Sequence, residues 1–101
     1  MTQIDHLVLF RWKSDAAPDA IAKAIDAVAE LPNQISGITA YVGGQQASAE
    51  GLGQGFDFAF RMTFLDAAAR DAYLPHPAHK AAIADHISPV LETVLVFDIQ
   101  H

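Results

Sequence analysis

The 101-residue sequence contains no cysteine, and it has only six lysine and arginine residues against twelve aspartate and glutamate residues. Without cysteine the chain has no disulfide framework, no thiolate zinc site and no cysteine nucleophile, so a metal could be held only by histidine, carboxylate or main-chain oxygen. The formal charge of −6 repels phosphate backbones and anionic lipid surfaces. We therefore expect no nucleic-acid partner and no membrane partner.

Long apolar runs are also absent. No stretch approaches the ~20 residues of a membrane-spanning helix, and the first residues carry no basic region before an apolar run. These features predict a cytoplasmic protein. Hydrophobic residues make up 51% of the chain and charged residues 18%, which is typical of a globular protein with apolar surface to spare. The length fits a single domain over residues 1–101.

The hydrophobic pattern alternates between two periods along the chain. Alternation in steps of two predicts strands, and apolar residues spaced three and four apart predict helices. Proline at 32 ends the first helix in this interpretation, Asp66 caps the second, and Pro77 begins the third. The predicted elements are a strand at Ile4–Trp12, a helix at Pro18–Leu31, strands at Ile38–Gly43 and Phe56–Phe64 joined by a loop at Gly43–Gly55, helices ending at Tyr73 and near Ile87, and a strand at Thr93–Gln100.

This order is β-α-β-β-α-β and predicts an α+β, ferredoxin-like fold, with a four-stranded antiparallel sheet and helices on one face. The opposite face would carry no helix, yet the strand alternation makes it apolar. An apolar uncovered face indicates that a second subunit packs against it. The residues assigned to this face are Leu7, Leu9, Tyr41, Leu95, Phe97 and Ile99.

Three histidines follow Tyr73 closely, at His76, His79 and His86. His76 precedes a proline and fits a helix N-cap, which places His79 in the first helical turn. The positive end of a helix favours the neutral imidazole that a general base requires. The alternative is that both residues only cap the turn. The spacing of His79 and His86 does not form a usual zinc site, because no carboxylate completes a three-ligand set.

His6 lies within the apolar alternation of the first strand. A histidine in such a position is most simply a hydrogen-bonded core residue. The functional alternative is that His6, Tyr73 and His79 converge in a pocket between sheet and helices, with Phe58 and Phe60 as its aromatic wall.

Four segments together resemble the stress-responsive dimeric α/β-barrel (Dabb) family. They are His6–Lys13, Ile35–Ile38, Gly55–Phe58 and Tyr73–His79, the last containing His-Pro-Ala-His. The resemblance covers nearly the whole chain. It implies a homodimer in which two sheets close into a barrel. Some relatives hold magnesium through main-chain oxygens, which here would lie near Pro32, Ile35 and Ile38.

The activity that the resemblance implies is less uniform, because the family includes stress-induced proteins without an assigned reaction and a plant polyketide cyclase that uses no cofactor. The cyclase pattern places its tyrosine on Tyr73, its catalytic base on His79 and a pocket histidine on His6. A further pocket histidine of the cyclase falls on Phe58, which makes this pocket more apolar.

Two functions follow as hypotheses. In the first, a homodimer binds a small apolar or aromatic ligand through His6, Phe58, Phe60 and His76, without turnover. In the second, the protein is a cofactor-free cyclase, lyase or isomerase in which His79 is the general base and Tyr73 donates a hydrogen bond to a developing oxyanion. A cofactor-independent monooxygenase of a related barrel family matches the histidine segment less well.

Overall fold

Four strands and one long helix make up most of residues 2–101, the part of the chain that the computed structural model describes. No helix in this part is both long and apolar enough to cross a membrane. The elements are β1 (Ile4–Trp12), α1 (Pro18–Gln34), β2 (Ile38–Gln45), β3 (Phe58–Phe64), α2 (Ala67–Tyr73), α3 (Pro77–Ala82), a π-helical segment (Ile83–Ile87) and β4 (Leu91–Gln100).

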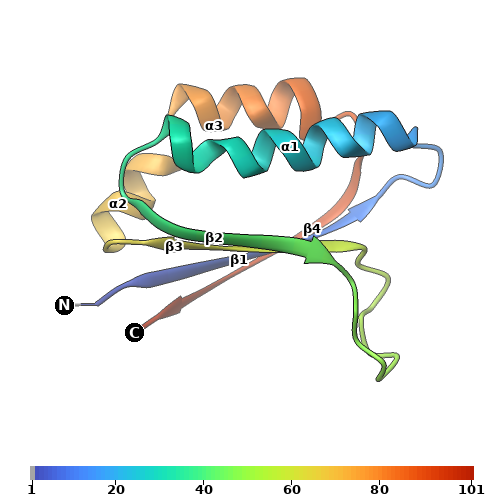
Figure 1. Ribbon diagram of the computed structural model, residues 1–101, viewed down its shortest axis with the longest axis horizontal. Helices are drawn as coiled ribbons and strands as arrows, with labels where there is room; N and C mark the ends of the chain where they lie inside the picture. Colours follow the sequence, from blue (N-terminus) through green and yellow to red (C-terminus); the bar gives the residue numbers. More distant parts are fainter. Residues whose placement is uncertain (1) are drawn as a thin grey trace.

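The strands form one antiparallel sheet in the order β2-β3-β1-β4. Helices α1 and α3 cover one face of the sheet, and α2 lies at one end of it (Figure 1). The loop between β2 and β3, residues 46–57, extends beyond the opposite end of the sheet and turns toward the side away from the helices (Figure 1). The predicted ferredoxin-like β-α-β-β-α-β fold is confirmed.

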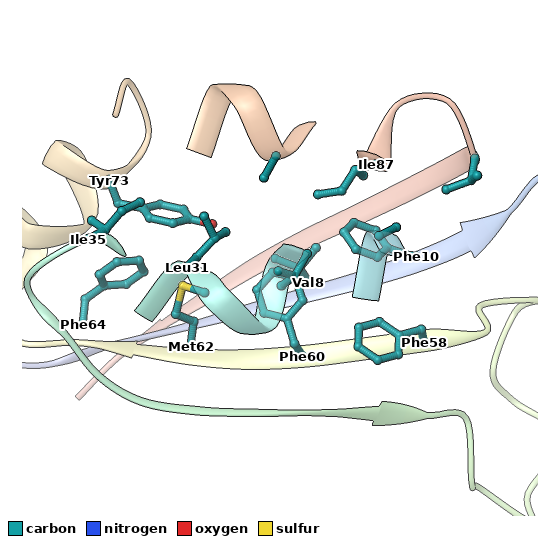
Figure 2. Close-up of a cluster of buried hydrophobic side chains, with 14 of the residues drawn as sticks. Val8, Phe10, Leu31, Ile35, Phe58, Phe60, Met62, Phe64, Tyr73 and Ile87 are labelled. Carbon is teal, nitrogen blue, oxygen red and sulfur yellow. The ribbon is translucent and has the colours of Figure 1, made fainter. Parts of the chain in front are cut away.

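The core lies between the sheet and α1, where the alternating residues of β1 and β3 meet the apolar stripe of the helix. In β1 this face carries Ile4, Val8 and Phe10, and in α1 it meets Ala24, Val28 and Leu31. Figure 2 shows the rings arranged along the sheet, with Tyr73 and Phe64 at one end and Phe10 and Phe58 at the other.

Two predicted boundaries were wrong. Helix α1 continues through Pro32 to Gln34. Proline lacks only its own N–H, and the helix resumes because the Ile35 N–H donates to the Leu31 carbonyl at 3.0 Å. Strand β2 continues past Gly43 to Gln45, because pairing with β3 holds the glycine pair in the ladder.

The other boundaries shift by a few residues. Strand β3 begins at Phe58, two residues after the predicted start, and β4 begins at Leu91, two residues before it. The helix predicted from Pro77 is present, but its last turn is π-helical. The Asp66 cap is confirmed, since its carboxylate accepts a hydrogen bond from the Ala69 N–H at 2.9 Å.

The face of the sheet away from the helices is apolar, as predicted, with one correction. Leu95 pairs with Leu9 and Phe97 with Leu7, so these four residues share the uncovered face. Phe97 is 61% exposed in the single chain. Tyr41 does not belong to this face, because the register shifts near the start of β2 and pairs Tyr41 with the buried Met62. Its side chain packs on the helix side instead.

Candidate functional site

A hydrogen-bonded chain of polar side chains begins at the buried His6 of β1. His6 and Asp98 are paired across β1 and β4, and the His6 Nδ1 lies 2.6 Å from Asp98 Oδ1. The other oxygen of Asp98 accepts a hydrogen bond from Arg70 Nη1 of α2 at 2.9 Å. An ionised carboxylate can only accept, so His6 donates through Nδ1. In the neutral imidazole, Nε2 is then the acceptor.

Tyr73, the last residue of α2, joins His6 to His79. The residue is 2% exposed, and its ring contacts the His6 ring at a centroid distance of 5.9 Å. On its other side it contacts the His79 ring at 4.2 Å. Burial raises the pKa of the Tyr73 hydroxyl above its ordinary value, with a smaller contribution from Tyr41. The hydroxyl therefore stays protonated near neutral pH and is able to donate.

The His79 imidazole is oriented by the main chain. Its Nδ1 lies 2.9 Å from the carbonyl oxygen of Leu74, which can only accept, so Nδ1 carries the hydrogen. Burial lowers the pKa of His79; the hydrogen bond to the Leu74 carbonyl partly offsets this effect, and nearby His6 and His76 lower the pKa further. We predicted a neutral imidazole from the helix end, but burial is the largest cause. Neutral His79 therefore presents a lone pair on Nε2.

His76 has the capping role predicted for it. Its backbone is extended, and its Nδ1 accepts a hydrogen bond from the Ala78 N–H at 3.0 Å. The structure thus gives His76 and His79 separate hydrogen bonds to the main chain, consistent with the structural alternative for both. For His79 that role leaves Nε2 free of the main chain.

The other end of the sheet holds a cavity of about 1000 Å³, open to solvent. It lies between the start of α1, the ends of β1 and β2, and the β2–β3 loop. Aromatic and aliphatic side chains form much of its wall, and amide side chains and Lys13 lie around it. The apolar lining residues include Trp12, Ile21, Ile25, Phe56 and Phe58.

The structure therefore divides the predicted site residues between two places. His6, Tyr73 and His79 form one contacting cluster, but none of the three lines the cavity, so the structure does not bring them into one pocket with Phe58 as predicted. Phe58 lines the cavity and pairs with Phe10, four residues along β1 from His6, or roughly 13 Å away. Phe60 lies between, with its ring centroid 6.3 Å from that of His6.

Three residues near the site were missed from the sequence. Arg70 and Asp98 join the His6 chain only because the topology brings α2 against the end of β4. Once the register between β1 and β4 is known, the alternation of side chains places His6 and Asp98 opposite each other on the same face of the sheet. Tyr41 was assigned to the wrong face, although its ring packs on Phe60 at 5.8 Å.

Metal binding finds no side-chain support in this structure. Within residues 2–101, no group of three or more His, Asp or Glu side chains is placed to hold a metal ion. The main-chain magnesium site near Pro32, Ile35 and Ile38 stays a prediction. One main-chain oxygen there, that of Leu31, already accepts the Ile35 N–H.

Comparison with known proteins connects this geometry to a family. Residues 4–101 match the family described as Stress responsive A/B Barrel Domain. The stress-response A/B barrel domain-containing protein HS1 of Arabidopsis thaliana is 34% identical over 95 residues, which cover 94% of this chain and 86% of that protein.

Two solved structures show the same fold. A dimeric ferredoxin-like protein of unknown function from Jannaschia is 28% identical with a TM-score of 0.82, covering 96% of this chain and 97% of that one. The hydroxynitrile lyase of Passiflora edulis is 22% identical with a TM-score of 0.88, covering 98% and 93%. At that identity the lyase shows the fold alone. From the match over residues 4–101 and the 34% identity to HS1, the chain belongs to the stress-responsive A/B barrel domain (Dabb) family.

Proposed function

We propose that the protein is a cytoplasmic homodimer that binds a small apolar or aromatic molecule between its sheet and helix α1. The observation that carries the proposal is the cavity of about 1000 Å³ beside Phe58. Small-molecule sites are concave, mainly apolar and of this order of size, ~300–1,000 Å³, with a few polar groups that orient the ligand. Trp12, Phe56 and Phe58 supply flat surfaces against which an aromatic ring can stack.

The charges at the cavity favour a neutral or weakly acidic ligand. Asp57 is its one carboxylate, and one of its oxygens accepts the Trp12 N–H at 2.9 Å. The other polar side chains that line it are Lys13, the amides of Gln45, Gln46 and Gln54, and the hydroxyls of Ser14 and Ser48. They can donate to a hydroxyl or carbonyl oxygen. In this proposal Phe58 touches the ligand, Phe60 and His6 support the wall from behind, and His76 holds the turn before α3.

The dimer part of the proposal comes from the uncovered face. Leu95, Phe97 and Ile99 are 42–61% exposed in the single chain, and Leu7 and Leu9 lie beside them. Contiguous apolar surface of this kind indicates a protein interface. Solved relatives with this fold are described as dimeric, and they support the same assembly here.

Binding is tested with 4-ethylphenol by titration calorimetry. We expect saturable binding to the wild type, weakened by Phe56→Ala, because that ring lines the cavity from the loop and its removal disturbs the core less than a change at Phe58. Leu52→Ala is the matched control, since Leu52 is 68% exposed on the same loop and does not line the cavity. Equal affinities in the two variants, or no binding to the wild type, would overturn the proposal. Cell fractionation tests the cytoplasmic location.

A second candidate function rests on a different observation, the hydrogen bond between His79 and Leu74. It fixes an imidazole tautomer with a lone pair on Nε2, next to the ring of Tyr73, whose hydroxyl is protonated. Such a base removes a proton from carbon next to a carbonyl. The proton goes to Nε2 of His79, the C–H electron pair becomes the C=C bond of an enolate, and the carbonyl π pair moves onto the oxygen, to which Tyr73 donates a hydrogen bond. This chemistry suits a cofactor-free cyclase, lyase or isomerase.

Turnover is tested by product analysis with aromatic ketones and polyketide mimics. Loss of a positioned base removes ~10²–10⁴-fold in rate, so His79→Asn is expected to lose activity by that factor while the fold is retained. Tyr73→Phe is expected to slow the reaction and keep the ring packing. His86→Asn is the control, because His86 is exposed on the next helical segment. Activity that survives both His79→Asn and Tyr73→Phe would remove these residues from the mechanism.

A further inference from the structure

Tyr41 lies on the helix face of the edge strand β2. The register shift between Ile38 and Ala40 pairs Tyr41 with Met62, and its ring packs on Phe60 at a centroid distance of 5.8 Å. The side chain is half-buried. It therefore occupies space between β2 and α1, on the side of the core that leads from the cavity toward His6.

The hydroxyl of Tyr41 extends along the strand and over Gly43. A Cβ placed on Gly43 would lie 2.6 Å from Tyr41 Oη and 3.0 Å from Cζ of Phe58. The Tyr41 hydroxyl and the tip of the Phe58 ring thus meet above the same glycine. Only glycine leaves room for this arrangement, because any larger residue would push the phenol or the phenyl ring aside.

Phe58 has the cavity on one side and Tyr41 on the other. Along α1 the cavity reaches as far as Ile25. One turn further, Val28 is buried in the core. On the β2 side the cavity includes Gln45 but not Tyr41. The phenol of Tyr41 therefore stands just behind the inner end of the cavity.

We propose that Tyr41 is the inner wall that limits how deeply a ligand enters the cavity, so that the site selects aromatic molecules with short side chains. The inference rests on the proposed ligand-binding function and names the substrate class of that same site. An aromatic ring held by Trp12 and Phe56 directs its para substituent inward past Phe58. The substituent ends where the phenol of Tyr41 begins.

A homologous series of 4-alkylphenols, from 4-ethylphenol to 4-octylphenol, measures the depth by titration calorimetry. Each methylene that enters apolar surroundings raises affinity about fourfold. Affinity should therefore rise with alkyl-chain length until the chain reaches Tyr41, and further carbons should add nothing. We expect the wild type to stop at a short chain. Tyr41→Ala is expected to continue the fourfold steps for several further carbons. Tyr41→Phe is expected to stop at most about one carbon later, since it keeps the ring.

Tyr41→Leu guards against a variant that fails to fold, because leucine retains packing on Phe60 and is shorter than tyrosine. If affinity keeps rising to a longer alkyl chain in Tyr41→Leu than in the wild type, that result alone supports the inference. The same stopping point in the wild type, Tyr41→Leu and Tyr41→Ala would overturn it and leave the binding function standing. No binding of any alkylphenol to the wild type or the variants would overturn both. Binding only in Tyr41→Ala would support the wall and overturn binding of this class by the wild type.

Discussion

Replacing Phe60 with alanine tests whether the core has been placed on the correct face of the sheet. Phe60 is 5% exposed, and its ring lies 5.9 Å from Phe10 and 5.8 Å from Tyr41. A buried aromatic ring removes roughly 150–250 Å² from water, worth about 4–6 kcal/mol at ~25 cal/mol per Å². Alanine keeps part of that area, so the expected loss in the free energy of unfolding is ~3–5 kcal/mol.

The loss is large against the ~5–15 kcal/mol that stabilises a typical domain. Urea unfolding at one fixed protein concentration measures this loss, because the proposed dimerisation would make the midpoint depend on concentration. With a slope of ~1–3 kcal/mol per M, the midpoint should fall by at least about 1 M. The control is Leu52→Ala, a residue 68% exposed in the β2–β3 loop, for which the change should stay within ~0.5 kcal/mol. An unchanged midpoint in Phe60→Ala would show that the other face of β3 is the buried one.

Three further predictions concern the polar cluster and the dimer. Burial lowers the pKa of His79 below 6.5, so the neutral residue contributes stability above pH 6.5 that is lost as the pH falls through its folded pKa. The free energy of unfolding, measured from pH 5 to 7.5, should therefore depend less on pH in His79→Gln than in the wild type. Asp98→Ala leaves the buried N–H of His6 unpaired and should cost about 1–3 kcal/mol in urea unfolding, whereas no loss would mean that His6 finds another partner. Phe97→Glu places a charge on the uncovered face and should give a folded monomer by light scattering at micromolar concentration, where we expect the wild type to be a dimer; a wild-type monomer would contradict the interface.

Much of the fold could be predicted because β1 and β3 alternate strictly and each has one buried face. Ile4, Val8 and Phe10 of β1, and Phe58 and Phe60 of β3, all face the helices as the pattern indicates. Side-chain direction in a strand has a period of two, so a single register error reverses every assignment after it. That happened at β2, where a shift near Ala40 reversed Tyr41.

The polar cluster was only partly predictable, for a different reason. His76 and His79 lie three positions apart and their hydrogen bonds are local, so turn chemistry alone indicated the His76 cap and the place of His79 in the first turn. The bond between His6 and Asp98 spans 92 positions in the sequence, and that between Arg70 and Asp98 spans 28. Contacts of that range depend on how β4 is placed in the sheet.

The proposed ligand cavity and the proposed catalytic cluster lie at different ends of one core, and free energies decide whether a single molecule reaches both. Phe60 and Met62 fill the space between Phe58 and the Tyr73 end of the cluster (Figure 2). Displacing the Phe60 ring costs up to the ~3–5 kcal/mol of its packing. A ligand with a Kd of ~1 mM has about 4 kcal/mol of binding free energy, which is no more than the displacement costs. A ligand with a Kd of ~1 μM has about 8 kcal/mol, which exceeds that cost. Molecules that bind the cavity weakly should therefore stay at the Phe58 end, and only substrates with micromolar or tighter affinity would reach Nε2 of His79.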